Sequence, residues 1–396
     1  MNYKLLLVPF LVLFLQSCKQ KNTEKKVITD KINTTIKKDS TLFVLPTFNT
    51  LKQSYVTKKH NEIADFYAQN LNIDNFNGGF LVAKNGKILF EDYKGYANYT
   101  TKEKITSSTP LHLASVSKVM TATVILKLVD QNKITLDTSL KSLFPEFPHS
   151  KITIETLLNH RSGLPNYAYF CENDSIWNSA KTLKNTDILQ LLSTKDIALE
   201  FTPNSKFSYC NTNYALLALV IEKITQKSYP EAMKELLFTP LQMKNTFVFK
   251  IDKQKKSVSK SYKSTWEEIP FDYLDGIYGD KNIYSTPQDI LKLDLATYSD
   301  LFLSKKIKEL AYKGYSYERK GVKNYGLGIR LSEWEDGTTL HYHNGWWHGN
   351  TSAYVTLKKD TVTMIALSNK YTRKVYQIKR LSALFGDYPF ELYEEE

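Results

Sequence analysis

Segments with strand-like patterns lie near both ends of this 396-residue chain, and helix-like segments fill the stretch between them. Near the start, two apolar runs flank Asn85-Gly86, which is a strong signal for a hairpin turn. Near the end, Thr351–Leu357 and Thr361–Leu367 form a second pair of strand patterns around a polar turn. Separate runs of strands and helices are typical of α+β folds, so we expect a helical region inserted between two halves of a sheet.

The clearest helical patterns lie in the middle of the chain. In Ser115–Asp130, apolar residues recur every four positions, which indicates one buried face. Asn213–Ile224 and Pro230–Phe238 are further helical segments. We expect one folded domain at about 55–390, with sheet halves at about 55–114 and 320–390, a helical part at about 115–319, and amphipathic helices at Lys58–Asn70 and Val375–Phe385.

The N-terminus has the pattern of a bacterial export signal. Lys4 precedes the apolar run Leu5–Gln16, which is shorter than the roughly 20 apolar residues of a membrane-spanning helix. The run leads to Leu-Gln-Ser-Cys18, which resembles a lipobox, the motif whose cysteine is lipidated. We predict a signal peptide at 1–17, a lipidated flexible tether at 18–50, and an exported lipoprotein anchored to a membrane of the cell envelope, on the periplasmic side or in the outer membrane. The alternative is an ordinary signal peptide with a chance cysteine.

Composition argues against several other classes of protein. The formal net charge is +12, but there is no dense basic block and no base-reading motif, so we expect no nucleic-acid partner. No Cys-x-x-Cys or His/Cys cluster indicates a metal, and we expect no cofactor. Export would permit a disulfide between Cys171 and Cys210, but two buried free thiols are the expected state.

The first chemical motif is Ser115-x-x-Lys118, at the start of a predicted helix. Positions three apart share a helix face, so the serine hydroxyl and the lysine amine can meet. A serine hydroxyl needs an adjacent base to act as a nucleophile, and burial near a helix N-terminus favours the neutral, basic lysine. The backbone N–H of Ser115 would also be free to bind an oxyanion.

The same tetrapeptide occurs again at Ser257–Lys260. An apolar helical stripe follows Lys118 and can bury it, whereas Lys260 is surrounded by other lysines without an apolar helix. A lysine in such surroundings stays solvated and charged. We therefore expect the second copy to be a surface segment.

The second motif is Tyr-x-Asn, at Tyr209 and Asn211, just before a predicted helix. A phenol can exchange a proton with the serine or with a leaving group, and an amide can bind the lysine and a substrate carbonyl. The pattern also occurs at Tyr96–Asn98, so the tripeptide alone discriminates little.

The third motif is His343-Asn344-Gly345, which precedes the C-terminal strand pair. Glycine lets a strand backbone approach a ligand closely. The N–H of Trp346 would then be placed as a second oxyanion donor. Taken alone, His343 would be read as a structural histidine.

In this order, Ser-x-x-Lys, Tyr-x-Asn and His-x-Gly resemble the family of class C β-lactamases, penicillin-binding DD-peptidases and esterases. The resemblance runs from about residue 60 to 385 and includes the stretches Leu157–Pro165 and Tyr325–Gly328. It implies a β-lactamase/transpeptidase-like fold, in which helices flank an antiparallel sheet and an all-helical subdomain is inserted. The site would lie between these two parts.

The resemblance also implies roles for single residues. Ser115 would attack a carbonyl and form an acyl-enzyme, while Lys118 and Tyr209 would share the acid–base work. Asn211 would orient the lysine and the substrate, and His343 would line the third wall of the site. The N–H groups of Ser115 and Trp346 would bind the oxyanion. The remaining implied site residues would lie beside the substrate: Gly345, Trp346 and Trp347.

The third motif departs from the Lys-Thr-Gly of dedicated β-lactamases. A lysine is permanently charged and attracts a substrate carboxylate, whereas a histidine is largely neutral near pH 7. This difference favours peptidase-like or esterase-like members of the family. Trp346 and Trp347 could narrow the acyl pocket, stack on a sugar or peptide, or pack under a neighbouring loop.

We therefore predict a serine hydrolase that acts through an acyl-enzyme on Ser115. Its expected substrates are small amides or esters, in particular D-amino-acid peptides of the cell wall. The alternatives are a carboxylesterase and an inactive binding lipoprotein of the envelope. The complete set of reactive side chains argues against the inactive protein.

Overall fold

The computed structural model describes residues 42–74 and 76–393. The predicted signal peptide at 1–17, the predicted lipidation site Cys18 and most of the predicted tether lie outside the described residues. Among the described helices, none is both long enough and apolar enough to cross a membrane. All the elements below belong to one compact unit, Phe43–Glu396.

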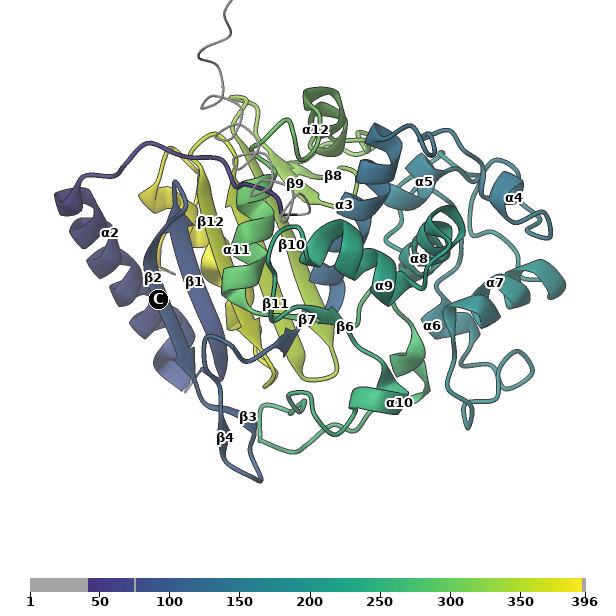
Figure 1. The fold of residues 1–396 in the computed structure, drawn as a ribbon, viewed down its shortest axis with the longest axis horizontal. Coiled ribbons are helices and arrows are strands. Elements are labelled where there is room, and N and C mark those ends of the chain that lie inside the picture. Colours follow the sequence, from purple (N-terminus) through teal and green to yellow (C-terminus); the bar gives the residue numbers. More distant parts are fainter. Residues whose placement is uncertain (1–41, 75, 394–396) are drawn as a thin grey trace, which may run out of the picture. The chain divides into compact units, whose positions relative to one another are not determined.

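A seven-stranded antiparallel sheet is the main sheet of this unit (Figure 1). Strands from the start and the end of the chain lie side by side in it, and Gly78 pairs with Ser368 where they meet. Antiparallel strands from both ends are what the sequence predicts. In spatial order the strands are β2 (Lys87–Lys94), β1 (Gly78–Lys84), β12 (Val362–Ser368), β11 (Asn350–Leu357), β10 (Thr339–Trp347), β9 (Arg330–Glu333) and β8 (Lys323–Tyr325).

The predicted hairpin at Asn85-Gly86 is confirmed. The two residues have φ angles of 50° and 72°, and β1 pairs with β2 on either side of them. A tight hairpin turn needs positive φ at both central residues, which asparagine and glycine tolerate best. The second predicted strand pair is confirmed as β11 and β12.

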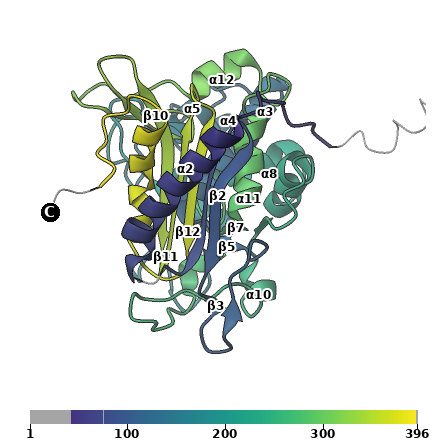
Figure 2. The ribbon, with the colours of Figure 1, turned by 90° about the vertical axis from the view of Figure 1, so that its left-hand side faces the viewer.

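Two helices cover one face of the main sheet (Figure 2). The first is α2 (Gln53–Phe66), which continues as a π-helical turn, Tyr67–Leu71, and so starts five residues before the predicted helix. The second is η6 (Lys374–Leu384), which has the predicted amphipathic character but is a 3₁₀-helix. Both bury apolar side chains against the strands, including Ile63, Phe66, Val375, Ile378 and Leu381.

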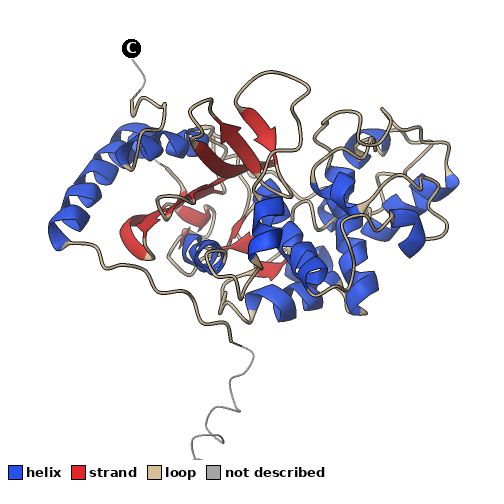
Figure 3. Cartoon of the chain, turned by 90° about the horizontal axis from the view of Figure 1, so that it is seen from above, coloured by secondary structure: helices blue, strands red, loops and turns tan. Residues whose placement is uncertain are grey.

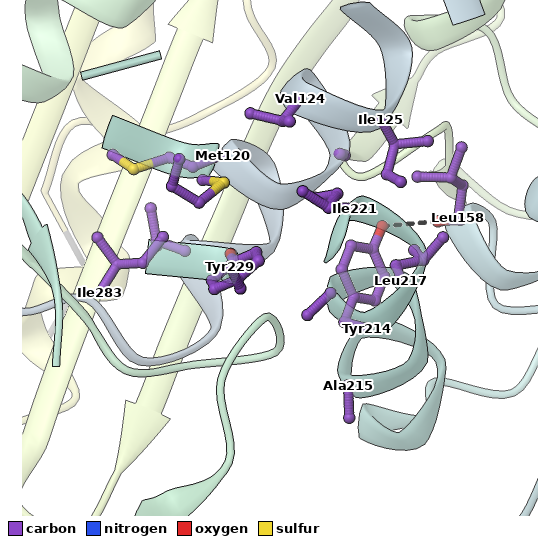
Figure 4. Close-up of a cluster of buried hydrophobic side chains, with 14 of the residues drawn as sticks. Met120, Val124, Ile125, Leu158, Tyr214, Ala215, Leu217, Ile221, Tyr229 and Ile283 are labelled. Atoms are coloured by element: carbon purple, nitrogen blue, oxygen red, sulfur yellow. Dashed lines mark hydrogen bonds between the residues drawn. The ribbon is translucent and has the colours of Figure 1, made fainter. Parts of the chain in front are cut away.

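Helices also pack on the opposite face and beside the sheet (Figure 3). The central helix of this group is α8, in which every residue from Thr212 to Ile221 is buried. It packs against α3, and the Tyr214 hydroxyl donates a hydrogen bond to Leu158 O at 2.8 Å (Figure 4). The α-helices of this region are α3 (Ser117–Asp130), α4 (Leu140–Leu143), α5 (Ile154–Leu158), α6 (Tyr167–Phe170), α7 (Asn185–Thr194), α8 (Asn211–Thr225), α9 (Tyr229–Met233), α10 (Ile251–Gln254), α11 (Pro287–Ala296) and α12 (Lys305–Ala311).

A small sheet within this region was not predicted. It has the order β5-β7-β6, formed by Leu111–His112, Ile283–Ser285 and Phe247–Val248. Strands of two or three residues are too short to show an alternating pattern in sequence. The small sheet matters for the site because β5 leads directly into the turn that carries Ser115.

Candidate active site

Ser115 lies at the entrance of α3, in the 3₁₀ turn η3 (Ala114–Val116). Ala114 has a φ of 46°, a left-handed conformation that is unfavourable for a residue with a Cβ atom. Hydrogen bonds hold it there, because the Ala114 N–H donates to His112 Nδ1 at 3.0 Å and the Leu113 N–H donates to Ile283 O at 2.8 Å. Strained backbone conformations that are held in this way cluster at functional sites. The side chain of Ser115, the next residue, is partly exposed.

Lys118 lies one helical turn further on and is fully buried. Its Nζ is 3.0 Å from Ser115 Oγ, 2.8 Å from Asn211 Oδ1 and 2.8 Å from Asp280 O. An ammonium group would donate to all three oxygens. A neutral amine would donate to Asn211 and Asp280 and accept a hydrogen bond from the serine. This arrangement can therefore receive the proton of the Ser115 hydroxyl.

The Tyr-x-Asn motif lies at the start of α8, where Cys210 is the N-cap residue. The Tyr209 ring centre is 5.1 Å from Lys118 Nζ and 4.6 Å from the guanidinium carbon of Arg330. The Lys118 amine and the Arg330 guanidinium therefore both lie against this ring. Tyr209 is partly exposed, so its phenol is accessible to a bound molecule.

His343 is fully buried in β10. Its Nε2 is 3.1 Å from the Tyr325 hydroxyl and its Nδ1 is 2.8 Å from Asn344 O. A carbonyl accepts only, so Nδ1 carries the proton and Nε2 accepts from the tyrosine. Burial, followed by the charges of Arg330 and Lys118, lowers the pKa of His343 well below its usual range, so the imidazole is neutral.

The five predicted reactive side chains come together from three distant parts of the chain. Lys118 contacts both Ser115 and Asn211, and the Tyr209 ring is near Lys118. The Tyr209 and His343 ring centres are 6.2 Å apart. The structure thus places all five in one neighbourhood at the junction of α3, α8 and β10.

At Gly345, the backbone of β10 lies close to the η3 turn that carries Ser115. A Cβ atom on Gly345 would lie 2.9 Å from Ser115 N, 2.5 Å from Leu113 O and 2.3 Å from Ser352 Oγ. Such distances leave no room for a side chain. β9 pairs with β10 only as far as Tyr342, so among the described strands none covers this edge of β10 beyond that residue.

The two tryptophans after Gly345 have different surroundings. Trp346 is 64% exposed, and its indole N–H donates to His348 O at 2.8 Å. Trp347 is half-buried, its indole N–H donates to Asp275 Oδ1 at 2.7 Å, and Lys281 Nζ lies 4.4 Å from its ring. Trp347 therefore packs into the domain, and Trp346 presents its ring to solvent.

The repeated motif at Ser257–Lys260 has none of these contacts. No helix follows Ser257, which is exposed, and Lys260 forms an ion pair with Glu268 at 3.3 Å. The expected surface segment is only partly correct, because Val258 and Ser259 are each 8% exposed. These two residues face inward since the loop packs against its neighbours.

Sequence reasoning missed two residues beside Tyr209. One is Arg330, a lone arginine on a short strand, for which there was no local signal. The other is His160, whose ring centre is 4.3 Å from that of Tyr209 and whose Nδ1 accepts from the Cys210 N–H at 3.1 Å. Burial, followed by the charge of Lys118, lowers the pKa of His160 well below its usual range. His160 is thus a neutral side chain that packs beside Tyr209 and holds the backbone of Cys210. The sequence signal that could have identified it was its position in Leu157–Pro165, one of the stretches that resemble the family.

The two cysteines that the structure describes are buried and free, as expected. Cys210 lies between Tyr209 and Asn211, and burial raises the pKa of its thiol to about 11. Burial likewise raises the pKa of Cys171 to about 12. Both thiols are therefore protonated at neutral pH and are poor nucleophiles.

One group of described side chains has the composition of a metal site. Ligand atoms of Asp272, Asp275 and His348 all lie within 4.8 Å of one another. The Asp275 carboxylate already accepts hydrogen bonds from Trp347 at 2.7 Å and from His348 at 3.0 Å. These contacts anchor the β10–β11 turn.

Comparisons with known proteins show which family this chain resembles in sequence and fold. The family model described as Beta-lactamase matches residues 70–385. Penicillin-binding protein 4* of Bacillus subtilis (strain 168) is 33% identical over 339 residues, which are 81% of this chain and 74% of that protein. Teichoic acid D-alanine hydrolase of Staphylococcus aureus is 29% identical over 249 residues, which are 61% of this chain and 59% of that protein, so less than two thirds of its length is matched. The crystal structure of a penicillin-binding protein from Bacillus halodurans has a TM-score of 0.71 at 22% identity, covering 82% of this chain and 99% of that chain, and shows likeness of fold.

Proposed function

Because this chain belongs to the β-lactamase family, we propose that Ser115 is the nucleophile through which it acts as a serine hydrolase. The family and the fold class predicted from the sequence are confirmed, and the chain is an enzyme of this type. One observation supports Ser115 above all. The buried Lys118 amine lies 3.0 Å from the Ser115 hydroxyl, and its contacts with Asn211 Oδ1 and Asp280 O orient it.

The proposed reaction has two stages. In the first, Lys118 takes the Ser115 proton as Oγ bonds to the substrate carbonyl carbon, and the N–H groups of Ser115 and Trp346 bind the oxyanion. Tyr209 then protonates the leaving amine or alcohol as its bond to the carbonyl carbon breaks, and draws its proton from Lys118. In the second stage, the oxygen of a water bonds to the acyl carbon and the bond from that carbon to Ser115 Oγ breaks. A proton of the water returns to Oγ through Lys118 and Tyr209, and the acid leaves. Asn211 holds Lys118 throughout.

We propose that the substrates are amides or esters of D-amino acids from the cell wall. Two relatives named above carry names that refer to penicillin binding and to teichoic acid D-alanine hydrolysis, which supports this class. His343 is neutral and cannot attract an anionic group, but Arg330 lies beside Tyr209 and is partly exposed. A guanidinium can pair with a carboxylate or phosphate on the substrate.

Labelling with a fluorophosphonate tests the nucleophile. We expect one adduct, mapped by mass spectrometry to the peptide that contains Ser115. Ser115→Ala should abolish it, and the matched control Ser257→Ala, in the repeated tetrapeptide, should leave it intact. Equal labelling of both variants would refute the assignment of Ser115.

A comparison of substrates separates the two enzyme classes. Hydrolysis of a nitrophenyl ester without cleavage of D-alanyl substrates would favour the alternative function, a carboxylesterase.

We also propose that the protein is exported and anchored through Cys18. The apolar run before Cys18 and the Leu-Gln-Ser that precedes it support this location. Cys18→Ala should move the protein from the membrane fraction to the soluble fraction. Continued retention at the membrane would contradict a lipid anchor at this residue.

A further inference from the structure

The chain segment 279–283 runs along the first turns of α3 and supplies one of the contacts of the proposed base. Thr121 Oγ1 donates to Gly279 O at 2.7 Å, and Lys118 Nζ donates to Asp280 O at 2.8 Å. The position of the Asp280 carbonyl therefore helps to set the position of the Lys118 amine. What holds this segment in place is consequently relevant to the reaction.

The side chains of Asp280 and Lys281 anchor the segment in the protein interior. They are 1% and 2% exposed, and Lys281 Nζ lies 3.6 Å from Asp280 Oδ2. Tyr167 joins them, because its hydroxyl accepts from Lys281 and donates to Asp280 Oδ2 at 2.7 Å. The other Asp280 oxygen has no hydrogen-bond partner among the described residues, so Lys281 is the group that compensates this buried carboxylate.

Lys281 also contacts the opposite side of the site. Its Nζ lies 4.4 Å from the ring of Trp347, the residue that follows Trp346 in β10. The Trp346 N–H is the proposed second oxyanion donor. One buried ammonium group thus lies against the segment that holds the base and against the strand end that holds the oxyanion donor.

We propose that Lys281 is a positioning residue for acylation. It holds the Lys118 amine through Asp280 and the Trp346 N–H through Trp347. This inference rests on the proposed function. Lys281 itself is too deeply buried to touch the substrate, so its effect is exerted through these neighbours.

Loss of Lys281 has a defined structural consequence. Replacing it by methionine leaves the Asp280 carboxylate buried and uncompensated. The segment 279–283 must then move to expose this carboxylate or to give it another partner, and the Asp280 carbonyl that Lys118 contacts moves with it. Acylation of Ser115 should slow, because a displacement of about 1 Å in a reacting group can lower a rate by about 10²-fold.

The chain offers a matched control for the loss of a buried lysine. Lys358 is largely buried and lies 2.7 Å from the fully buried Asp294, on α11, so it repeats the Lys–Asp pairing away from Ser115. Lys281→Met and Lys358→Met would each be made in the full chain. The rate of fluorophosphonate labelling, kcat and KM for a nitrophenyl ester, and thermal unfolding would be measured for both variants.

We expect Lys281→Met to lower kcat and the labelling rate about 10- to 100-fold with little change in KM. Lys358→Met should lower the unfolding temperature and leave the labelling rate unchanged. A Lys281→Met labelling rate equal to that of the unaltered protein, or an equal decrease in Lys358→Met, would overturn the inference. If Lys281→Met does not fold, Tyr167→Phe decides, because it removes the hydroxyl that joins Lys281 to Asp280. Its control is Tyr388→Phe, which removes a hydroxyl that donates to Asp360 Oδ2 at 2.7 Å. Slower labelling in Tyr167→Phe alone supports the inference, and no change overturns it. Failure of the unaltered protein to label at Ser115 would instead overturn the proposed function.

Discussion

The guanidinium carbon of Arg330 lies 4.6 Å from the centre of the Tyr209 ring. Arg330 opens β9 and pairs across the sheet with Tyr342, the last residue of β10 that β9 covers. It therefore stands at the point where the edge of β10 becomes open. A neutral His343 occupies the third motif, so Arg330 restores a positive charge to this wall from a different strand.

We expect Arg330→Gln to weaken the hydrolysis of substrates that carry an anionic group. A charge-assisted pair with a carboxylate would be lost, which corresponds to a decrease in kcat/KM of about 10- to 100-fold for a peptide that ends in D-Ala-D-Ala. A neutral nitrophenyl ester should be affected much less. The comparison of the two substrates is the measurement, with the exposed Arg319 changed to Gln as the control. An equal decrease for both substrates would show that Arg330 acts on Tyr209 instead.

Gly345→Ala should inactivate the enzyme with little loss of fold. The new methyl group would meet Ser115 N, Leu113 O and Ser352 Oγ, so β10 and the η3 turn that carries Ser115 must separate. Displacing one oxyanion donor lowers kcat by about 10²–10³. The acylation rate with a fluorophosphonate would report this loss, and circular dichroism would report the fold. Gly386→Ala, whose methyl group would lie 3.2 Å from the Tyr388 ring and 3.5 Å from Asp360 Oδ2, is the control and should react at the normal rate.

Local sequence patterns predicted those parts of the molecule that local physics determines. Asn85-Gly86 specifies its turn, and the four-residue apolar spacing in Ser115–Asp130 predicts the helix that α3 forms. The contacts of Arg330 with Tyr209 and of Lys281 with Tyr167 join residues more than 100 positions apart, and no periodicity or spacing encodes them. The same holds for the small β5-β7-β6 sheet, whose strands exist because distant segments meet.

Stability should fall in mild acid because buried histidines must stay neutral. Burial lowers the pKa of His341 to about 4, whereas an unfolded chain binds the same proton near pH 6.5. The unfolded state therefore binds more protons below about pH 6.5, and the stabilisation that is present above this pH is lost as pH falls. The free energy of unfolding should decrease by about 1.4 kcal/mol per pH unit for this residue down to about pH 4.

His341→Gln provides the comparison for this effect. His341 lies outside the predicted site, and its Nε2 contacts Tyr312 O at 3.2 Å, a bond that a glutamine amide can replace. Urea unfolding at several pH values should give a shallower pH slope for the variant, by about one proton. An unchanged slope would mean that His341 does not contribute to the acid sensitivity.

Asn211→Asp tests the contact between Asn211 and the proposed base with a change of almost no volume. The asparagine oxygen accepts from Lys118 Nζ at 2.8 Å, and a carboxylate in its place would hold the amine by charge as well as by hydrogen bonding. The amine would then be less available to the Ser115 hydroxyl, so kcat/KM should fall by about two orders of magnitude. The fluorophosphonate labelling rate should fall in parallel, since it reports the same attack by Ser115. Labelling of Asn211→Asp at the normal rate would argue that Lys118 is not the base.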